Sequence, residues 1–215
     1  FRQDYFIKGG LKMSNKKTME YLNQQKFVAT KNSELIAKDI KVNFNQDIFS
    51  PIIECLVKND YTPKTFKEIF ECVDSKKYNH NNALQVLLVL IQSASIQPCL
   101  DSTTDAMKTS AHNLNKKLLE NFEFSYANVV LASPVTGAGV YTDILQAIAV
   151  LIHFKHPKAK HSEWIDHYID YLAHNDLSIN DDNKKKLSDR KDIKAYIEKN
   201  VSPNIPLWKA LGILP

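Results

Sequence analysis

Glycine is scarce in this chain, which has only five glycines among 215 residues. None of them belongs to a G-x-G-x-x-G turn or to a G-x-x-x-x-G-K-[ST] loop. Loops that hold a dinucleotide or a nucleoside triphosphate need glycine, because the backbone must turn tightly and approach the phosphates closely. The sequence therefore contains neither of these nucleotide-binding loops.

Arginine is scarcer still, because Arg2 and Arg190 are the only arginines among 28 basic residues. Arginine is the preferred side chain for bidentate contacts with phosphate and guanine. The segments 155–161 and 184–186 are rich in lysine, but the formal net charge is only +4. We expect these lysines to lie on solvated faces, and the composition disfavours a nucleic-acid partner.

The cysteines are few and odd in number: Cys55, Cys72 and Cys99 match no metal-ligand spacing. Cys55 and Cys72 fall within apolar helical stretches, so we expect reduced core residues, as in a cytoplasmic protein. The longest apolar run, residues 86–91, is far shorter than the roughly 18–20 residues of a membrane-spanning helix. The sequence therefore predicts no membrane span, and it shows no signal peptide.

The hydrophobic pattern predicts a mainly α-helical fold with small β elements, of the α+β class, built from winged-helix-like units. Residues 47–100 have the pattern of three helices followed by a short strand. We place Asp47 as the first N-cap, Thr65 and Glu68 as a capping box, and Asn79 as the third N-cap. The third helix is apolar nearly all round, so we expect it to lie centrally and buried.

The segment before this unit, residues 1–46, is expected to contain a short helix over 16–24 and a β-hairpin. Apolar and polar residues alternate in 26–31 and again in 38–45, which predicts two half-buried strands.

The polar segment 101–110 is the predicted linker between two domains, 1–104 and 105–215. The second domain is expected to contain a helix, a strand, a loop with unusual backbone angles, three further helices and an apolar tail. We place these elements at residues 111–125, 129–133 and 134–140, in a helix from Thr142 or Asp143 to Pro157, in a helix capped by Ser162, in a charged helix over 182–200, and in a tail that packs Leu207, Trp208 and Leu211.

Five histidines crowd into one short stretch: His153, His156, His161, His167 and His174. A zinc site needs three or four ligands, and neither a cysteine nor an H-E-x-x-H pattern accompanies these residues. We expect no metal site here and place the histidines on the solvent-facing sides of two helices.

Other side chains allow both a chemical and a structural interpretation. Asp166 and Asp170, four residues apart, could hold a cation, although an exposed amphipathic face explains them more simply. Ser133 and Thr136 lie in a glycine-containing stretch, but it has no G-x-S-x-G elbow, so we predict no nucleophile there. Tyr171 is predicted on a helix surface, where it could contact a peptide.

Three stretches, residues 1–10, 47–70 and 130–154, together resemble one protein family. They are similar to the C-terminal half of bacterial S-adenosylmethionine-dependent methyltransferases that carry a methyltransferase regulatory domain. That group includes protein-lysine methyltransferases acting on outer-membrane proteins. The residues that carry the resemblance are Phe-Arg at 1–2, Pro-Lys-Thr-Phe-Lys-Glu-Ile at 63–69 and Ala-Ser-Pro at 132–134.

The resemblance implies a noncatalytic part of a protein lysine methyltransferase, which recognises the substrate or regulates access to the active site. S-adenosylmethionine is then expected in a catalytic domain that precedes Phe1. No catalytic, cofactor-binding or metal residue can be carried over, and the substrate-binding residues stay unknown. The expected partners are the protein substrate and the chain's own methyltransferase domain, with a homodimer as a further option. A winged-helix DNA-binding protein and a scaffold or dimerisation module are the alternatives.

Overall fold

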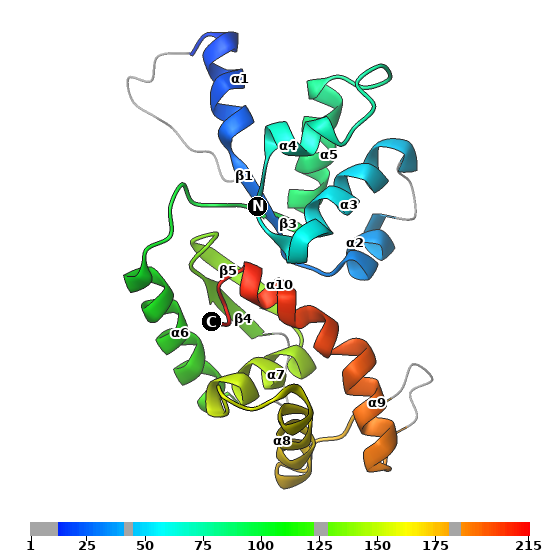
Figure 1. Cartoon of the computed structure of the whole chain (residues 1–215), viewed down its shortest axis with the longest axis vertical. Helices are drawn as coiled ribbons and strands as arrows, with labels where there is room; N and C mark the ends of the chain where they lie inside the picture. Colours follow the sequence, from blue (N-terminus) through cyan, green and yellow to red (C-terminus); the bar gives the residue numbers. More distant parts are fainter. Residues whose placement is uncertain (1–12, 41–44, 123–128, 181–185) are drawn as a thin grey trace, which may run out of the picture.

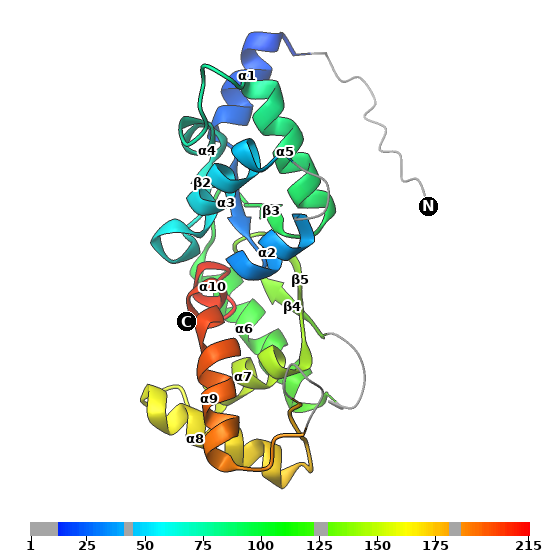
Figure 2. The ribbon, with the colours of Figure 1, turned by 90° about the vertical axis from the view of Figure 1, so that its right-hand side faces the viewer.

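The computed structural model describes residues 13–40, 45–122, 129–180 and 186–215. Its elements in chain order are α1 Asn15–Gln24, β1 Lys26–Ala29, α2 Ser33–Ile40, α3 Gln46–Tyr61, β2 Lys64–Thr65, α4 Phe66–Glu71, α5 His80–Gln92, β3 Ile96–Pro98, α6 Asp105–Glu120, β4 Val129–Ser133, β5 Ala138–Thr142, α7 Ile144–Lys155, α8 His161–His174, α9 Arg190–Asn200, the 3-10 helix Ser202–Asn204 and α10 Ile205–Ala210. The elements up to β3 form the upper half of the molecule, and those from α6 onward the lower half (Figures 1 and 2). The predicted mainly helical fold with small antiparallel sheets is confirmed.

The upper half contains a three-stranded antiparallel sheet in which β1 lies between β2 and β3. The helix predicted over 16–24 and the strand predicted to begin at residue 26 are confirmed as α1 and β1. The expected half-burial of that strand is wrong, because Phe27, Val28 and Ala29 are all buried. A strand in the middle of a small sheet, with α3 packed against it, is covered more completely than a hairpin strand would be.

The predicted hairpin between residues 26–31 and 38–45 is also wrong. The chain turns into helix α2 at Ser33, and the side-chain oxygen of Asn32 accepts a hydrogen bond from the Leu35 N–H at 2.9 Å. This cap starts a helix where strand alternation was expected. Residues 41–44 lie outside the described residues, and the partners of β1 come from far along the chain.

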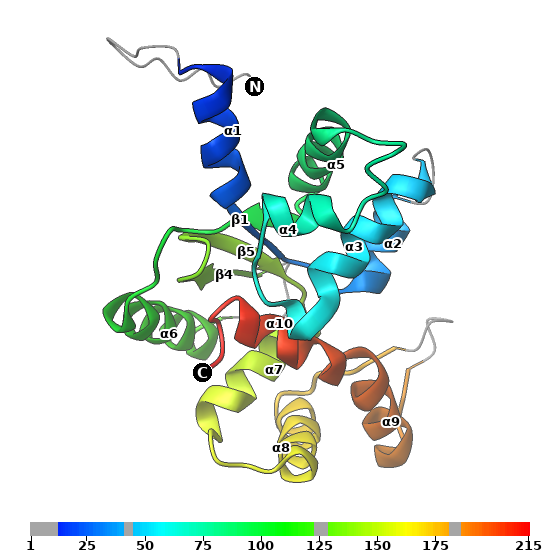
Figure 3. The same ribbon diagram turned by 45° about the horizontal axis from the view of Figure 1, so that its top comes forward.

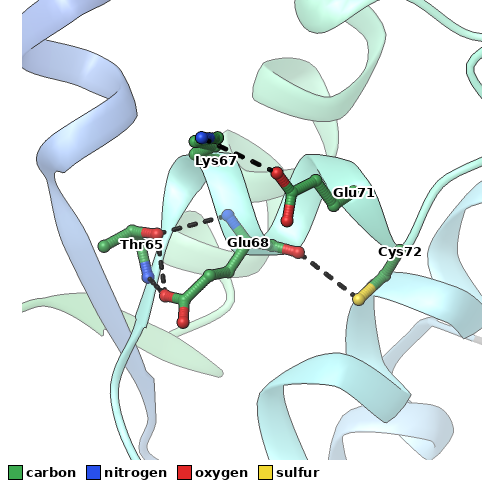
Figure 4. A network of polar contacts seen from close by, with 5 residues as sticks. All are labelled: Thr65, Lys67, Glu68, Glu71 and Cys72. Atoms are coloured by element: carbon green, nitrogen blue, oxygen red, sulfur yellow. Dashed lines mark hydrogen bonds and ion pairs between the residues drawn. The ribbon is translucent and has the colours of Figure 1, made fainter.

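The caps of the middle helices were predictable from local sequence. Thr65 and Glu68 form the expected capping box, with Glu68 Oε2 accepting from the Thr65 N–H at 2.7 Å (Figure 4). Asn79 caps α5 as predicted. Asp47 was the wrong choice for α3, because Asn45 Oδ1 accepts from the Asp47 N–H at 3.0 Å.

Helix α3 loses its helical backbone near its end, where Asn59 and Asp60 take left-handed conformations with φ of 56° and 54°. The expectation that α5 is buried all round is wrong, since the side chain of Leu88 is 53% exposed. The buried face of α5 consists of Ala83, Val86, Leu87 and Leu90. Helix α5 is therefore amphipathic, and its outer face is open to solvent.

In the lower half, the linker and the loop are both shorter than predicted. Thr104 caps α6, which begins at Asp105. The helix therefore starts inside the predicted linker 101–110 and before residue 111, where it was expected to start. Strand β4 is confirmed, but β5 begins inside the expected loop, at Ala138, and pairs antiparallel with β4. The remaining turn contains Gly137, whose φ of +68° is a conformation that favours glycine.

The last helices follow the predicted order with two corrections. Helix α7 is capped by Asp143 and ends before Pro157, as expected. Ser162 does not cap α8: Glu163 Oε2 accepts from the Lys160 N–H at 3.0 Å, and the helix starts at His161, two residues before the start that a Ser162 cap would give. The charged helix begins only at Arg190, because Asp189 caps α9; residues 181–185 lie outside the described residues.

The C-terminal tail joins the two halves. Leu207, Trp208 and Leu211 are buried as predicted, and α10 packs against α3 of the upper half (Figure 3). Buried residues of both halves belong to one continuous hydrophobic core. None of the helices within the described ranges has the length and apolar character needed to cross a lipid bilayer.

Candidate functional site

A cleft lies where the upper and lower halves meet, and we call it the central cleft. It consists of two adjoining lobes of about 290 and 270 Å³. Four residues line both lobes: Asn32, Leu35, Asp143 and Gln146. The first lobe is lined by residues of α2 and of the end of α9, and the second by residues of β5 and α10.

The wall of the central cleft on the α2 side is fixed by Asn32. Its oxygen caps α2 through the Leu35 N–H, and its Nδ2 donates to Asn204 Oδ1 at 3.0 Å. Asn204 is buried and also donates to the Asn200 carbonyl at 3.2 Å. A chain of amide groups therefore links the start of α2 to the end of α9, and it holds the two halves at a defined separation.

The opposite wall is the start of helix α7. Asp143 Oδ1 accepts from the Gln146 N–H at 2.8 Å. The residue is open to solvent at the cleft mouth, but the surrounding walls desolvate the carboxylate and raise the pKa of Asp143 above its ordinary value. Gln146 Nε2 donates to the Asn200 carbonyl at 3.1 Å, while its Oε1 is buried and has no hydrogen-bond partner among the described residues.

The lining of the central cleft combines amides, aromatic rings and charges of both signs. Leu35 is 46% exposed and Tyr141 is 69% exposed, so apolar surface is open at the rim. The charged residues of the lining are Lys31, Lys199, Glu34 and Asp143. Such a surface suits an extended peptide, whose backbone amides need hydrogen bonds and whose side chains need small apolar contacts.

The histidines of α7 and α8 form a packed corner away from the central cleft. The rings of His156 and His167 stack with centroids 3.7 Å apart, and the ring of His153 lies 4.8 Å from Trp164. His161 and His174 are exposed as predicted, whereas the other three are half-buried, so their placement toward solvent was wrong. Across the described ranges, no three His, Cys, Asp or Glu side chains gather as a metal site would require.

This corner makes the stability of the fold sensitive to pH. Burial lowers the pKa of His153, and the nearby charges of Lys209 and His161 lower it further. The pKa of His156 is lowered by desolvation and by His167 and Lys155. Because the unfolded chain titrates near the usual histidine pKa of about 6.5, it binds more protons than the folded chain just below that pH.

We therefore expect the free energy of unfolding to fall as the pH is lowered from 7.5 to 5.5. Urea unfolding at each pH measures this fall. His153→Gln should reduce it, whereas His174→Gln, on the exposed side of α8, should leave it unchanged. Equal pH profiles for the two variants would contradict the assignment to His153.

The remaining candidates have structural partners. The Arg190 guanidinium donates to Asp170 at 2.7 Å and to Asp166 at 3.0 Å. The acidic pair therefore binds the Arg190 side chain. Ser133 is buried, and its hydroxyl donates to the Leu211 carbonyl at 2.7 Å. The Ala-Ser-Pro motif therefore anchors the C-terminal tail.

Tyr171 does not lie on an open helix surface as predicted. It is half-buried against the core, and the Lys155 ammonium lies 4.9 Å from its ring centroid. The central cleft, by contrast, was missed by the sequence reasoning, which left the substrate-binding residues unknown. The available local signal was Asn32, a good N-cap residue, but nothing near it in sequence points to Asn204.

No protein-family model, curated protein or solved structure matches this chain.

Proposed function

We propose that this chain is a noncatalytic substrate-recognition or regulatory part of a cytoplasmic, S-adenosylmethionine-dependent protein lysine methyltransferase. The observation that carries the proposal is the central cleft, together with the sequence resemblance at residues 63–69 and 132–134. Its protein partners are the methyl-accepting substrate and the catalytic domain, where S-adenosylmethionine would bind.

The chemistry of the cleft supports a peptide ligand. Asn32 and Asn200 line the first lobe, and each amide nitrogen carries a second N–H, beyond the one that it donates within the chain, which a peptide carbonyl would accept. Leu35 offers an apolar contact at the point shared by the two lobes. Lys31 and Lys199 are balanced in the cleft by Glu34 and Asp143, so we propose recognition of the peptide backbone ahead of recognition of charge.

The proposed mechanism is positional. An extended segment bound in the central cleft would hold the rest of the substrate chain near the methyl donor, so that part of the entropy of association is lost before the chemical step. Binding energy from a remote segment then contributes to the reaction at the lysine.

The arrangement of α5 does not support the DNA-binding alternative. Its exposed face carries Asn81, Gln85, Leu88 and Gln92, and none of these side chains is charged. A recognition helix reads base edges through a row of polar side chains on its exposed face, and Leu88 interrupts that row on α5.

One observation favours the dimerisation alternative. A groove of about 530 Å³ runs between α6 and the β4–β5 hairpin, where Leu114 is 57% and Val130 44% exposed. Sedimentation of the purified chain tests this alternative. A dimer that becomes a monomer in Leu114→Glu would support a scaffold, and a chain that stays monomeric at high concentration would exclude the dimerisation alternative.

The proposed function is tested with overlapping peptides from bacterial outer-membrane proteins. We expect unstructured peptides to bind at micromolar to millimolar affinity and to shift NMR signals of Asn32, Leu35 and Gln146. S-adenosylmethionine should give no heat of binding with this chain alone. Methyl transfer by the isolated chain, or peptide binding that leaves the central-cleft signals unchanged, would overturn the proposal.

A further inference from the structure

Two cysteines that are separated in sequence meet between α3 and α4. Cys55 lies in the second half of α3, and Cys72 follows the last residue of α4. Both sulfur atoms approach the same backbone oxygen: Cys55 Sγ lies 3.8 Å and Cys72 Sγ 3.4 Å from the Glu68 carbonyl. Figure 4 shows the Cys72 sulfur turned back toward that carbonyl. The Cys72 side chain is also a hydrogen-bond partner of the Cys55 thiol.

The two thiols differ in access. Cys72 is exposed, whereas Cys55 is 6% exposed and belongs to the hydrophobic core. Burial, together with the adjacent Cys72 thiol, raises the pKa of Cys55 to about 12. An oxidant from solvent can therefore reach Cys72 first, and Cys55 is placed behind it to complete the reaction.

We propose that Cys55 and Cys72 are a reversible disulfide-forming pair that fastens the end of α4 to α3 under oxidising conditions. The inference does not depend on the proposed function. It revises the expectation that both residues are inert core thiols, since a cytoplasmic disulfide is typically transient and redox-sensing. The third cysteine, Cys99, directly follows strand β3, is buried and belongs to the hydrophobic core.

The chemistry is thiol–disulfide exchange with a small disulfide such as glutathione disulfide. The Cys72 thiol loses its proton to solvent, and the resulting thiolate attacks one sulfur of glutathione disulfide. One glutathione leaves as a thiolate and takes up a proton. Cys55 then loses its proton, and its sulfur attacks the Cys72 sulfur of the mixed disulfide, releasing the second glutathione. The two cysteines lose two electrons and two protons, and glutathione disulfide becomes two molecules of glutathione.

Two physical consequences distinguish this pair from adventitious oxidation. The second step needs the Cys55 thiolate, so closure of the bond should accelerate about tenfold per pH unit between pH 7.5 and 8.5. The bond closes a loop over residues 56–71 and removes conformational freedom from the unfolded chain. We expect the melting temperature to rise by about 5–10 °C.

The experiment treats the folded chain with glutathione disulfide, blocks remaining thiols in denaturant and maps the peptides by mass spectrometry. We expect a Cys55–Cys72 link, with Cys99 recovered as the blocked thiol. Cys99→Ser is the matched control and should keep both the link and the rise in melting temperature. Dithiothreitol should reverse both.

Cys72→Ser removes an exposed thiol and keeps the core intact, so it should fold normally and show no rise on oxidation. The proposal is overturned by a lasting glutathione adduct on Cys72, by a link that involves Cys99, or by dimers joined through Cys72. It is equally overturned if Cys72→Ser shows the same rise in melting temperature as the unchanged chain.

Discussion

Replacement of Asn115 by alanine is expected to lower the free energy of unfolding by about 2–4 kcal/mol. Asn115 of α6 is fully buried, and its side chain pairs with one residue of β4 as a neighbouring strand would. Its Nδ2 donates to the Ala132 carbonyl at 2.9 Å, and the Ala132 N–H donates to its Oδ1 at 2.7 Å. Alanine leaves both backbone groups without these partners at a half-buried position.

The matched control is Asn113→Ala, on the exposed side of the same helix. Both changes raise helix propensity by the same small amount, so their difference isolates the contacts with Ala132. Urea unfolding of the two variants measures that difference. If Asn115→Ala stays within about 0.5 kcal/mol of Asn113→Ala, the α6–β4 contact contributes little to the fold.

Local signals in the sequence were sufficient wherever one residue and its near neighbours decide the structure. Thr65, Asn79 and Asp143 cap helices because their side-chain oxygens reach backbone N–H groups three residues ahead. The same local chemistry at Asn32 was overlooked, because alternation in the following residues favoured a strand. Amphipathic alternation and a short helix are hard to separate in segments of this length.

Non-local contacts could not be predicted in this way. Strand β1 pairs with β2 and β3, and no pattern within residues 26–31 specifies partners so far along the chain. One wall of the central cleft depends on the contact between Asn32 and Asn204, which lie 172 residues apart in the sequence. Cys55 and Cys72 meet for the same reason, since their approach follows from how α3 crosses α4.

The largest effect on function is expected from Leu35→Glu. Leu35 lines both lobes of the central cleft, and it is 46% exposed, so it is available to a ligand. Covering a leucine side chain with a peptide contributes about 1.5–3 kcal/mol, which corresponds to roughly ten- to hundredfold in affinity. A glutamate there loses this contact and adds a charge beside Glu34 and Asp143.

Leu88→Glu provides the control that separates recognition from stability. Leu88 is 53% exposed on α5 and lines neither lobe of the central cleft, so the same substitution changes surface hydrophobicity and charge elsewhere. Titration of the peptide that binds most tightly should show an affinity at least tenfold weaker for Leu35→Glu and unchanged for Leu88→Glu, with similar melting temperatures. In the complete methyltransferase, the protein substrate should lose kcat/KM by the same factor, while a peptide too short to reach the cleft should not. Since that short peptide reports only on the catalytic centre, an equal loss for both substrates would mean that Leu35 acts on the catalytic domain rather than on the substrate chain.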